Sequence, residues 1–338
     1  MNIAITGGGT GGHLSIAKAI KEELNKRGIK PIFIGSTYGQ DRAWFEDDKG
    51  FSKCYFFDTS GVVNKKGLKK IFSLLNIFKY SLSCRQIFRL HDIDIVFSVG
   101  GYSSAPASFA AILFKKDLFI HEQNSIYGKL NKVLKNFSKA IFCSFDKNSP
   151  IKEYPIRDEV FKHSKIKADI KTVIFLGGSQ GASFINSFAL SVAKELRDRG
   201  IKIIHQCGKK EYEKLKEAYK KLDIKVDLFD FDKNLILKLK DADFAISRAG
   251  ASTLWELCAL ATPTLFVPYP YAAGDHQYYN AKYLQDKNLA FVKREDQLKK
   301  EDLFLCLEKD LQSMSQKLKD EFKPHGAKKI VDYMLYFR

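Results

Sequence analysis

The fold is decided by a strand, a glycine cluster and a helix start in the stretch Asn2-Ile3-Ala4-Ile5-Thr6-Gly7-Gly8-Gly9-Thr10-Gly11-Gly12-His13. Apolar residues predict a strand over 2–5, and the pattern from His13 to Arg27 predicts a helix. Glycine permits positive φ and close approach to a ligand, and the free N–H groups at a helix start attract anions. The stretch therefore predicts a turn that binds phosphate or diphosphate.

Two common nucleotide-binding motifs fit this turn poorly. Residues 7–12 satisfy the dinucleotide pattern GxGxxG, which also expects an acidic residue after the second strand to hold a ribose. That strand ends at residues 33–37, and the first acid after it is Asp41. A P-loop needs Lys and then Ser or Thr after its last glycine, where this chain has His13-Leu14. Both readings are weakened.

The same order of elements begins again in the second half of the chain. Strand candidates at 31–35, 53–57, 94–99, 117–121 and 140–144 alternate with helical patterns, which indicates parallel βαβ units. The pattern lapses over 149–169 and restarts with a strand at 172–176 and the glycine turn 177–182. We therefore predict an α/β protein with two Rossmann-like domains facing across a cleft. The expected ranges are 1–157, 158–322 and a C-terminal helix over 323–338 that packs back on the first domain.

Two further turns follow predicted strands and open predicted helices. The first is Gly100-Gly101-Tyr102-Ser103-Ser104-Ala105-Pro106, a second candidate anion site in the first domain. The other is Ser247-Arg248-Ala249-Gly250-Ala251-Ser252-Thr253, followed by Glu256. A carboxylate three residues after a Thr is also a helix-capping pattern, so Glu256 has either a capping role or a role in binding ribose hydroxyls.

Size and composition indicate an ordinary globular enzyme. The chain has 338 residues, of which 45% are hydrophobic and 28% charged, and this length favours two domains. The formal net charge is +17, with +11 on residues 1–157 (24 basic, 13 acidic) and +6 on the remainder (32 basic, 26 acidic). Such a surplus suits nucleic acid, anionic lipid or phosphorylated substrates. A lysine-rich proteome is the alternative explanation.

The expected compartment is the cell interior. Six scattered cysteines form no CxxC pair and no metal-ligand spacing, which favours buried thiols in a reducing environment. The first residues show no basic export segment with a cleavage site, and no apolar run reaches the ~20 residues of a membrane span.

Taken together, the motifs resemble the MurG family of peptidoglycan N-acetylglucosaminyltransferases, which have two domains of the GT-B type. The matching segments occur in family order at 8–13, 100–103, 121–124, 177–182, 248–251 and 275–281. The resemblance implies UDP-N-acetylglucosamine as donor and undecaprenyl-diphosphoryl-N-acetylmuramoyl-pentapeptide as acceptor. It also implies inversion at the anomeric carbon and a peripheral location on the cytoplasmic face of the inner membrane.

The resemblance also assigns site residues. Donor binding is expected at Thr10, Gly11, Gly12, Asn124, Arg157, Ser179, Ala251, Thr253, Glu256 and Gln277. Contact with the acceptor diphosphate is expected at Gly9, Gly101, Tyr102 and Ser103.

The reaction needs a base near neutral pH to take the proton of the acceptor hydroxyl. His13 lies at a helix N-terminus, where the helix dipole favours a neutral imidazole, so His13 is either this base or a contact of the acceptor diphosphate. Glu122 is a second candidate base. The alternative for His121 and Glu122 is a structural role at a strand end.

No obligatory metal or other cofactor is expected. The acidic pairs Asp92/Asp94 and Asp241/Asp243 have DxD spacing, but each precedes its strand and so belongs to the amino end of a sheet. Leaving-group charge can instead be met by backbone N–H groups and helix N-termini.

Three other functions compete with this interpretation. One is another GT-B UDP-sugar transferase acting on a lipid, and another is an NAD(P)-dependent oxidoreductase that rests on GxGxxG alone. The third is a basic membrane- or RNA-binding protein without activity. No aromatic-basic RNA motif is present, so no nucleic-acid partner is expected.

One segment of the first domain predicts a membrane contact. No acidic residue lies between Asp58 and Asp92. The basic residues include Lys65, Lys66, Lys69 and Lys70, and helical spacing aligns Ile71, Phe72, Leu75 and Phe78. A basic amphipathic helix against anionic lipid explains both features. A helix whose apolar stripe faces the core explains the stripe alone.

Overall fold

The computed structural model describes residues 1–61, 66–178, 182–232 and 235–336. The chain forms two compact units. The first comprises residues 1–157 with 325–338, and the second comprises residues 158–324. The helix α6 (Asp158–Phe161) lies inside the segment 149–169, where the sequence pattern lapses, and the change of unit falls immediately before it.

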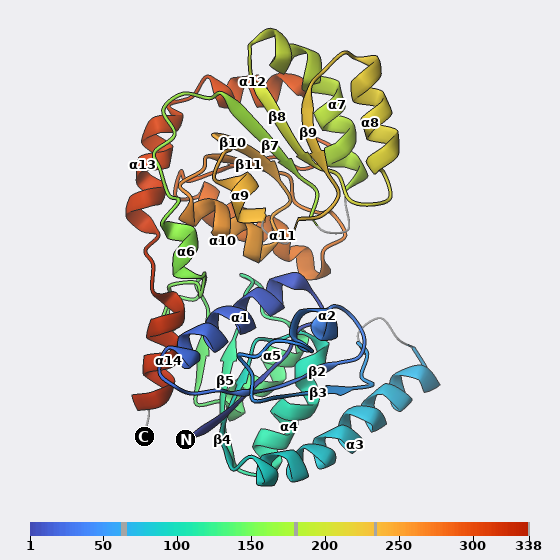
Figure 1. Cartoon of the computed structure of the whole chain (residues 1–338), viewed down its shortest axis with the longest axis vertical. Coiled ribbons are helices and arrows are strands. Elements are labelled where there is room, and N and C mark those ends of the chain that lie inside the picture. The colour runs from blue at the N-terminus through green and yellow to red at the C-terminus, as the bar shows by residue number, and fades with distance from the viewer. Residues whose placement is uncertain (62–65, 179–181, 233–234, 337–338) are drawn as a thin grey trace. The chain divides into compact units, whose positions relative to one another are not determined.

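A six-stranded parallel sheet forms the centre of the first unit, with strand order β3-β2-β1-β4-β5-β6 (Figure 1). Its strands are β1 (Asn2–Thr6), β2 (Ile32–Ser36), β3 (Lys53–Phe57), β4 (Ile93–Ser98), β5 (Asp117–His121) and β6 (Ala140–Phe142). The strands β1, β2 and β5 are buried over nearly all their length and apolar at most positions, because helices cover both faces of such a sheet.

The helices of the first unit follow their strands in regular alternation. They are α1 (Gly11–Asn25), α2 (Asp41–Phe45), α3 (Leu68–Leu90), α4 (Ala105–Leu113), α5 (Lys129–Leu134) and α14 (Gly326–Tyr336), with short 3-10 turns η1 (Tyr102–Ser104) and η2 (Lys135–Phe137). The helix expected from His13 begins two residues earlier, so Gly11 and Gly12 belong to the first turn of α1. Their N–H groups therefore belong to the set that has no partner within the helix.

The second unit repeats the design with the order β12-β11-β10-β7-β8-β9, again parallel. Its strands are β7 (Thr172–Leu176), β8 (Lys202–Gln206), β9 (Val226–Phe229), β10 (Phe244–Ser247), β11 (Thr264–Phe266) and β12 (Phe291–Val292). Its helices besides α6 are α7 (Ser183–Asp198), α8 (Tyr212–Lys221), α9 (Leu235–Leu239), α10 (Ala251–Ala259), α11 (His276–Gln285), α12 (Lys300–Leu307) and α13 (Leu311–Glu321), with η3 (Ala273–Asp275).

Both units have the Rossmann strand order. Counted within each unit, the order is 3-2-1-4-5-6, which reverses between the first and fourth strands. The switch points are therefore β1/β4 and β7/β10, and ligands of open α/β sheets bind beyond the carboxyl ends of the strands at such points. The predicted α/β fold with two Rossmann-like domains is confirmed.

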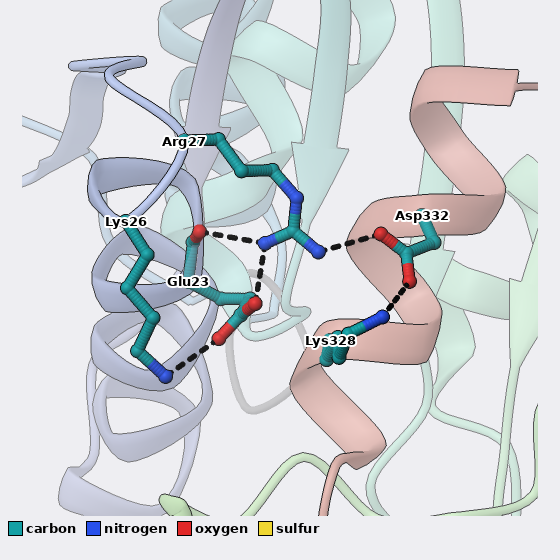
Figure 2. Close-up of polar contacts among 5 residues, drawn as sticks. All are labelled: Glu23, Lys26, Arg27, Lys328 and Asp332. Carbon is teal, nitrogen blue, oxygen red and sulfur yellow. Dashed lines mark hydrogen bonds and ion pairs between the residues drawn. The ribbon is translucent and has the colours of Figure 1, made fainter.

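The C-terminal helix α14 belongs to the first unit and lies beside α1 (Figure 2). Arg27 connects the two helices, since its guanidinium pairs with Asp332 at 2.5 Å and also with Glu23. Lys26 and Lys328 complete the network, at 2.8 Å from Glu23 and 2.7 Å from Asp332. The chain thus returns to its first domain after completing the second.

Candidate active site

Two glycine clusters meet at the switch point of the first unit. Gly8 N–H donates to the Gly100 carbonyl oxygen at 3.1 Å. A Cβ on Gly7 would lie 2.3 Å from that same oxygen, and a Cβ on Gly101 would lie 2.3 Å from the Gly8 oxygen. Gly7 and Gly101 also have φ of 113° and 80°, which favours glycine. The turn after β1 and the turn after β4 therefore form one continuous backbone surface, which we call the glycine platform (residues 7–12 and 100–103).

Asp41 lies beneath this platform and was not predicted as a site residue. Its fully buried carboxylate accepts hydrogen bonds from the N–H groups of Gly9 and Ser36, the latter at 2.9 Å. Burial raises the pKa of Asp41, and these backbone hydrogen bonds oppose that rise. The Gly9 N–H is thus occupied by Asp41, and the contact of Gly9 with the acceptor diphosphate stays a prediction.

Tyr102 and Ser103 occupy different environments. The Tyr102 ring packs on the glycine platform, since a Cβ on Gly9 would lie 2.7 Å from its Cε1 atom. Ser103 is fully buried, and its hydroxyl lies close enough to Asp41 to lower the pKa of that carboxyl. The Ser103 hydroxyl is buried and has no hydrogen-bond partner among the described residues, so its contact with the acceptor diphosphate stays a prediction. Gly101 and the half-buried Tyr102 remain on the accessible side.

His13 joins the glycine platform to the segment that follows β5. Its Nδ1 atom lies 3.0 Å from Thr10 Oγ1, and its Nε2 atom lies 3.0 Å from Gln123 Nε2. One neutral tautomer satisfies both contacts, with Nδ1–H donating to Thr10 and Nε2 accepting from Gln123. Gln123 belongs to the segment 121–124 that resembles the family, and its contact with His13 spans 110 residues.

Glu122 organises the segment after β5. Its buried carboxylate accepts hydrogen bonds from Asn124 N–H at 3.0 Å, Gly128 N–H at 2.9 Å and the Asn131 side chain at 2.9 Å. Burial raises its pKa, whereas these donors lower it. Burial also lowers the pKa of the neighbouring His121 to about 3. The geometry favours the structural alternative for both residues over a catalytic role for Glu122.

The turn between β10 and α10 is the corresponding feature of the second unit. Gly250 caps α10, Ala251 is buried in its first turn, and Glu256 is half-buried on the same helix. Ser252 Oγ lies 3.5 Å from a Glu256 carboxylate oxygen. Thr253 is also half-buried. A carboxylate therefore stands partly accessible on the helix that begins at the switch point of this unit.

Gln277 connects this turn to the end of β11. Its side-chain oxygen accepts hydrogen bonds from Ala249 N–H at 3.2 Å and from Tyr269 N–H at 3.0 Å. The Arg248 guanidinium donates to the Val267 carbonyl oxygen at 3.1 Å and pairs with Glu295. These contacts were not predicted, because they join residues 8 to 47 positions apart.

A buried polar cluster lies at the carboxyl end of β8. His205 contacts Tyr219 Oη at 2.9 Å through Nδ1 and Asn186 Oδ1 at 3.0 Å through Nε2. Burial lowers the pKa of His205 to about 4. Asn186 also donates to Glu211 at 2.8 Å, and Ser183 at the start of α7 donates to the same carboxylate. The start of α7 is thus held to β8 by side chains, and residues 179–181 just before it lie outside the described residues.

Comparison with known proteins decides the family. The sequence matches the glycosyltransferase family 28 N-terminal domain over residues 3–143 and the C-terminal domain of that family over residues 172–334. A relative from Campylobacter fetus is 53% identical, covering 98% of this chain and 99% of the relative. A relative from Wolinella succinogenes is 50% identical over 99% and 100% of the two chains. Both carry the name UDP-N-acetylglucosamine--N-acetylmuramyl-(pentapeptide) pyrophosphoryl-undecaprenol N-acetylglucosamine transferase.

The chain belongs to the MurG family. Among solved structures, MurG of Acinetobacter baumannii superposes with a TM-score of 0.77 at 25% identity, covering 98% of both chains. The glycosyltransferase SnogD from Streptomyces nogalater, at 14% identity and a TM-score of 0.65, shares the fold. The predicted glycosyltransferase class of enzyme is confirmed.

The structure divides the predicted donor residues of this MurG-family chain into two sets. The first unit holds Thr10, Gly11, Gly12, Asn124 and Arg157, and the second unit holds Ala251, Thr253, Glu256 and Gln277. Ser179 lies outside the described residues. Within each unit, the members near the switch point gather at the carboxyl ends of the strands, while Arg157 ends the first unit's main segment.

The DxD-like pairs lie at the opposite ends of the sheets. Asp94 accepts a hydrogen bond from Asn2 N–H at the start of β1, and Asp243 accepts from Thr172 N–H at the start of β7, both at 3.0 Å. In the part of the chain that the structure describes, no three His, Cys, Asp or Glu side chains are grouped so as to hold a metal ion.

The helix α3 presents an exposed apolar surface. Ile71, Phe72, Leu75 and Phe78 are 53%, 64%, 56% and 57% exposed. The buried residues of α3 are Ser73, Ser81, Cys84, Ile87 and Phe88. The apolar stripe therefore does not face the core, and the second half of the helix supplies most of its packing. Lys65 lies outside the described residues, and Lys66, Lys69 and Lys70 are exposed. Within the described residues, no helix is long and apolar enough to span a membrane.

Replacing His13 and Glu122 should have different consequences. We expect His13→Ala to lower kcat/KM for the acceptor by about 10²-fold or more, because it removes either a base or a diphosphate contact. We expect Glu122→Gln to lower the melting temperature of the first unit, since a hydrogen bond to a buried charge contributes about 1.5–3 kcal/mol. Steady-state kinetics measure kcat/KM, and thermal unfolding measures the melting temperature, for both variants. A Glu122→Gln enzyme with unchanged melting and a 10²-fold lower kcat would contradict this assignment.

Proposed function

We propose that this MurG-family enzyme transfers N-acetylglucosamine from UDP-N-acetylglucosamine to undecaprenyl-diphosphoryl-N-acetylmuramoyl-pentapeptide, with inversion. The observation that carries the proposal is the pair of Rossmann units, each with a glycine-containing turn into a helix at its switch point, in a chain about half identical to enzymes named for this transfer. The product is the disaccharide lipid from which peptidoglycan is built.

The acceptor diphosphate is assigned to the glycine platform. The N–H groups of Gly11 and Gly12 belong to the first turn of α1, where partial positive charge favours an anion. Gly101 and Tyr102 border the same surface, and His13 lies in the next position of the helix. The assignment of Thr10, Gly11 and Gly12 to the donor is the competing possibility, because the leaving diphosphate of UDP needs the same chemistry.

The geometry limits how His13 can act. Both ring nitrogens already have partners in Thr10 and Gln123. A base must offer a lone pair, so the acceptor hydroxyl has to replace one of these partners at a ring nitrogen. Replacement of the Gln123 amide at Nε2 leaves Thr10 to hold the tautomer through Nδ1. The proton taken from the hydroxyl then stays on Nε2 as the new glycosidic bond forms and UDP departs.

The donor is assigned to the second unit. Glu256 stands partly accessible after the β10 turn and can accept both hydroxyls of a ribose. Gln277 holds the same turn in place through its side-chain oxygen. The dinucleotide alternative needs a carboxylate after β2, and the one present, Asp41, is fully buried and bonded to backbone. The donor diphosphate is proposed to be stabilised by helix N-termini without an obligatory metal.

Replacing Glu256 tests the donor assignment. Glu256→Ala should raise the donor KM and the UDP Kd by about ten- to a hundred-fold, because it removes a charged hydrogen-bond acceptor. The acceptor KM should not change. Glu217→Ala, an exposed carboxylate on α8 of the same unit, is the control. Calorimetry with UDP and initial rates give both constants. An unchanged UDP Kd in folded Glu256→Ala, or stronger thermal stabilisation of the wild type by NAD than by UDP, would contradict the assignment.

The exposed face of α3 is proposed to rest on the anionic cytoplasmic surface of the inner membrane. Four large apolar side chains stand in solvent on this face, and a lipid surface would cover them. The neighbouring lysines Lys66, Lys69 and Lys70 supply positive charge, and Lys65 adds to it in the sequence. Such a contact brings the glycine platform to an acceptor whose lipid tail stays in the bilayer. No nucleic-acid partner is proposed.

Charge removal tests this contact. Replacing Lys65, Lys66, Lys69 and Lys70 with Gln should weaken binding to anionic vesicles at low salt, since each basic residue near the surface contributes about 1 kcal/mol. Turnover of a water-soluble acceptor should be retained. Replacing Lys214, Lys216, Lys220 and Lys221 on α8 removes the same charge elsewhere and is the control. Equal vesicle binding by the two variants in flotation assays would exclude α3 as the membrane contact.

A further inference from the structure

Asp41 combines complete burial with direct contact to the glycine platform. It begins the short helix α2, five residues after the end of β2 at Ser36, and none of its surface is exposed. Its two carboxylate oxygens receive hydrogen bonds from different segments, Oδ1 from Gly9 N–H and Oδ2 from Ser36 N–H. One side chain therefore fixes the loop after β1 to the loop after β2.

The backbone around the Asp41 carboxylate approaches so closely that it leaves no room for a Cβ at three neighbouring glycines. A Cβ on Gly8 would lie 2.4 Å from Asp41 Oδ1, and a Cβ on Gly35 would lie 2.9 Å from Oδ2. On the other side of the loop, a Cβ on Gly39 would lie 2.7 Å from the Gly9 carbonyl oxygen. Gly8 in the loop after β1 and Gly35 within β2 thus both approach the carboxylate closely, and Gly9 lies between Asp41 and the backbone at Gly39.

The hydrogen bond from Gly9 fixes the direction of its N–H group at the start of the loop that leads into α1. The loop from Gly9 to Gly11 is two peptide units long, and α1 begins at its end. Gly9 N–H is directed to Asp41, whereas Gly11, Gly12 and His13 at the start of α1 are partly exposed. The same bond keeps the negative charge of Asp41 saturated by backbone donors and away from an incoming anion.

We propose that Asp41 is the positioning residue of the acceptor-diphosphate site. It acts through Gly9, by orienting the N–H groups of Gly11 and Gly12 and the ring of His13 toward the diphosphate. This inference rests on the proposed function, because it takes the glycine platform to be the place where the acceptor diphosphate binds. Asp41 itself touches neither substrate.

Asp41→Asn tests this role while preserving the shape of the side chain. An amide nitrogen cannot accept a hydrogen bond, so one of the two N–H groups loses its partner. We expect the acceptor KM to rise at least about tenfold, which corresponds to losing one hydrogen bond to a charged group. The donor KM and the UDP Kd should stay within about twofold of the wild type, as an orienting role predicts. Asp47→Asn, an exposed acid six residues away with the same change of charge, should behave like the wild type.

A change in the acceptor KM without a change in the donor KM distinguishes a positioning role from a general loss of stability. A merely structural role would reduce the folded, active fraction, which lowers kcat for every substrate pair and leaves both KM values unchanged. That result would overturn the proposal. An equal rise in donor and acceptor KM would overturn it as well. If Asp41→Asn does not fold, Asp41→Ser supplies a smaller side chain that keeps one acceptor oxygen, and the same split is expected.

Binding of inorganic diphosphate to the wild type tests the inference without variants and without turnover. Titration with inorganic diphosphate should shift the amide NMR signals of Gly11 and Gly12 more than that of Gly9, because Gly9 N–H is held by Asp41. The largest shift at Gly9 would overturn the proposal. Absence of turnover with the muramoyl lipid, together with the expected diphosphate shifts, would instead contradict the proposed function and leave the role of Asp41 standing.

Discussion

The backbone contact between the turn after β1 and the turn after β4 constrains most of the first unit. Gly8 N–H bonds to the Gly100 oxygen, and the approach at Gly7 and Gly101 leaves no space for a Cβ on either. This contact fixes the start of α1 relative to the start of α4, so the N–H groups of one helix and the aromatic ring at the start of the other border one surface. The buried Asp41 and the His13–Gln123 pair both depend on the loop conformation that this contact sets.

In the second unit, side chains rather than backbone contacts hold the turn at the switch point. At its switch point the turn after β10 is held by side chains, with Gln277 accepting from two backbone N–H groups and Arg248 donating to the end of β11. The backbone contact in the first unit suits a surface that presents N–H groups to an anion. The side-chain contacts in the second unit leave Glu256 accessible enough to accept hydrogen bonds from hydroxyl groups. The two units therefore share a strand order but differ in the chemistry that each displays at its carboxyl edge.

Sequence patterns predicted the features that depend on neighbouring residues. Strands, glycine turns and the repeat of the Rossmann order follow from local periodicity, and the strand at 172–176 was placed to the residue. Asp41 and Gln123 were missed because their partners lie 32 and 110 residues away, and no local pattern reports such a contact. The burial of Ser103 depends on the same long-range packing. The exposure of Ile71 and Phe72 agrees with the amphipathic surface helix that the absence of acidic residues indicated, whereas the apolar stripe alone fits a core-facing helix equally well.

The central claim is that anion-binding turns in two Rossmann units serve one transfer between UDP-N-acetylglucosamine and a diphosphoryl lipid. The most direct measurement incubates the purified chain with this donor and undecaprenyl-diphosphoryl-N-acetylmuramoyl-pentapeptide, and analyses the products by mass spectrometry and NMR. We expect one UDP to be released for each disaccharide lipid formed, and the new glycosidic bond to have the anomeric configuration opposite to that of the donor. UDP release that does not depend on the lipid, or a product that retains the donor configuration, would contradict the claim.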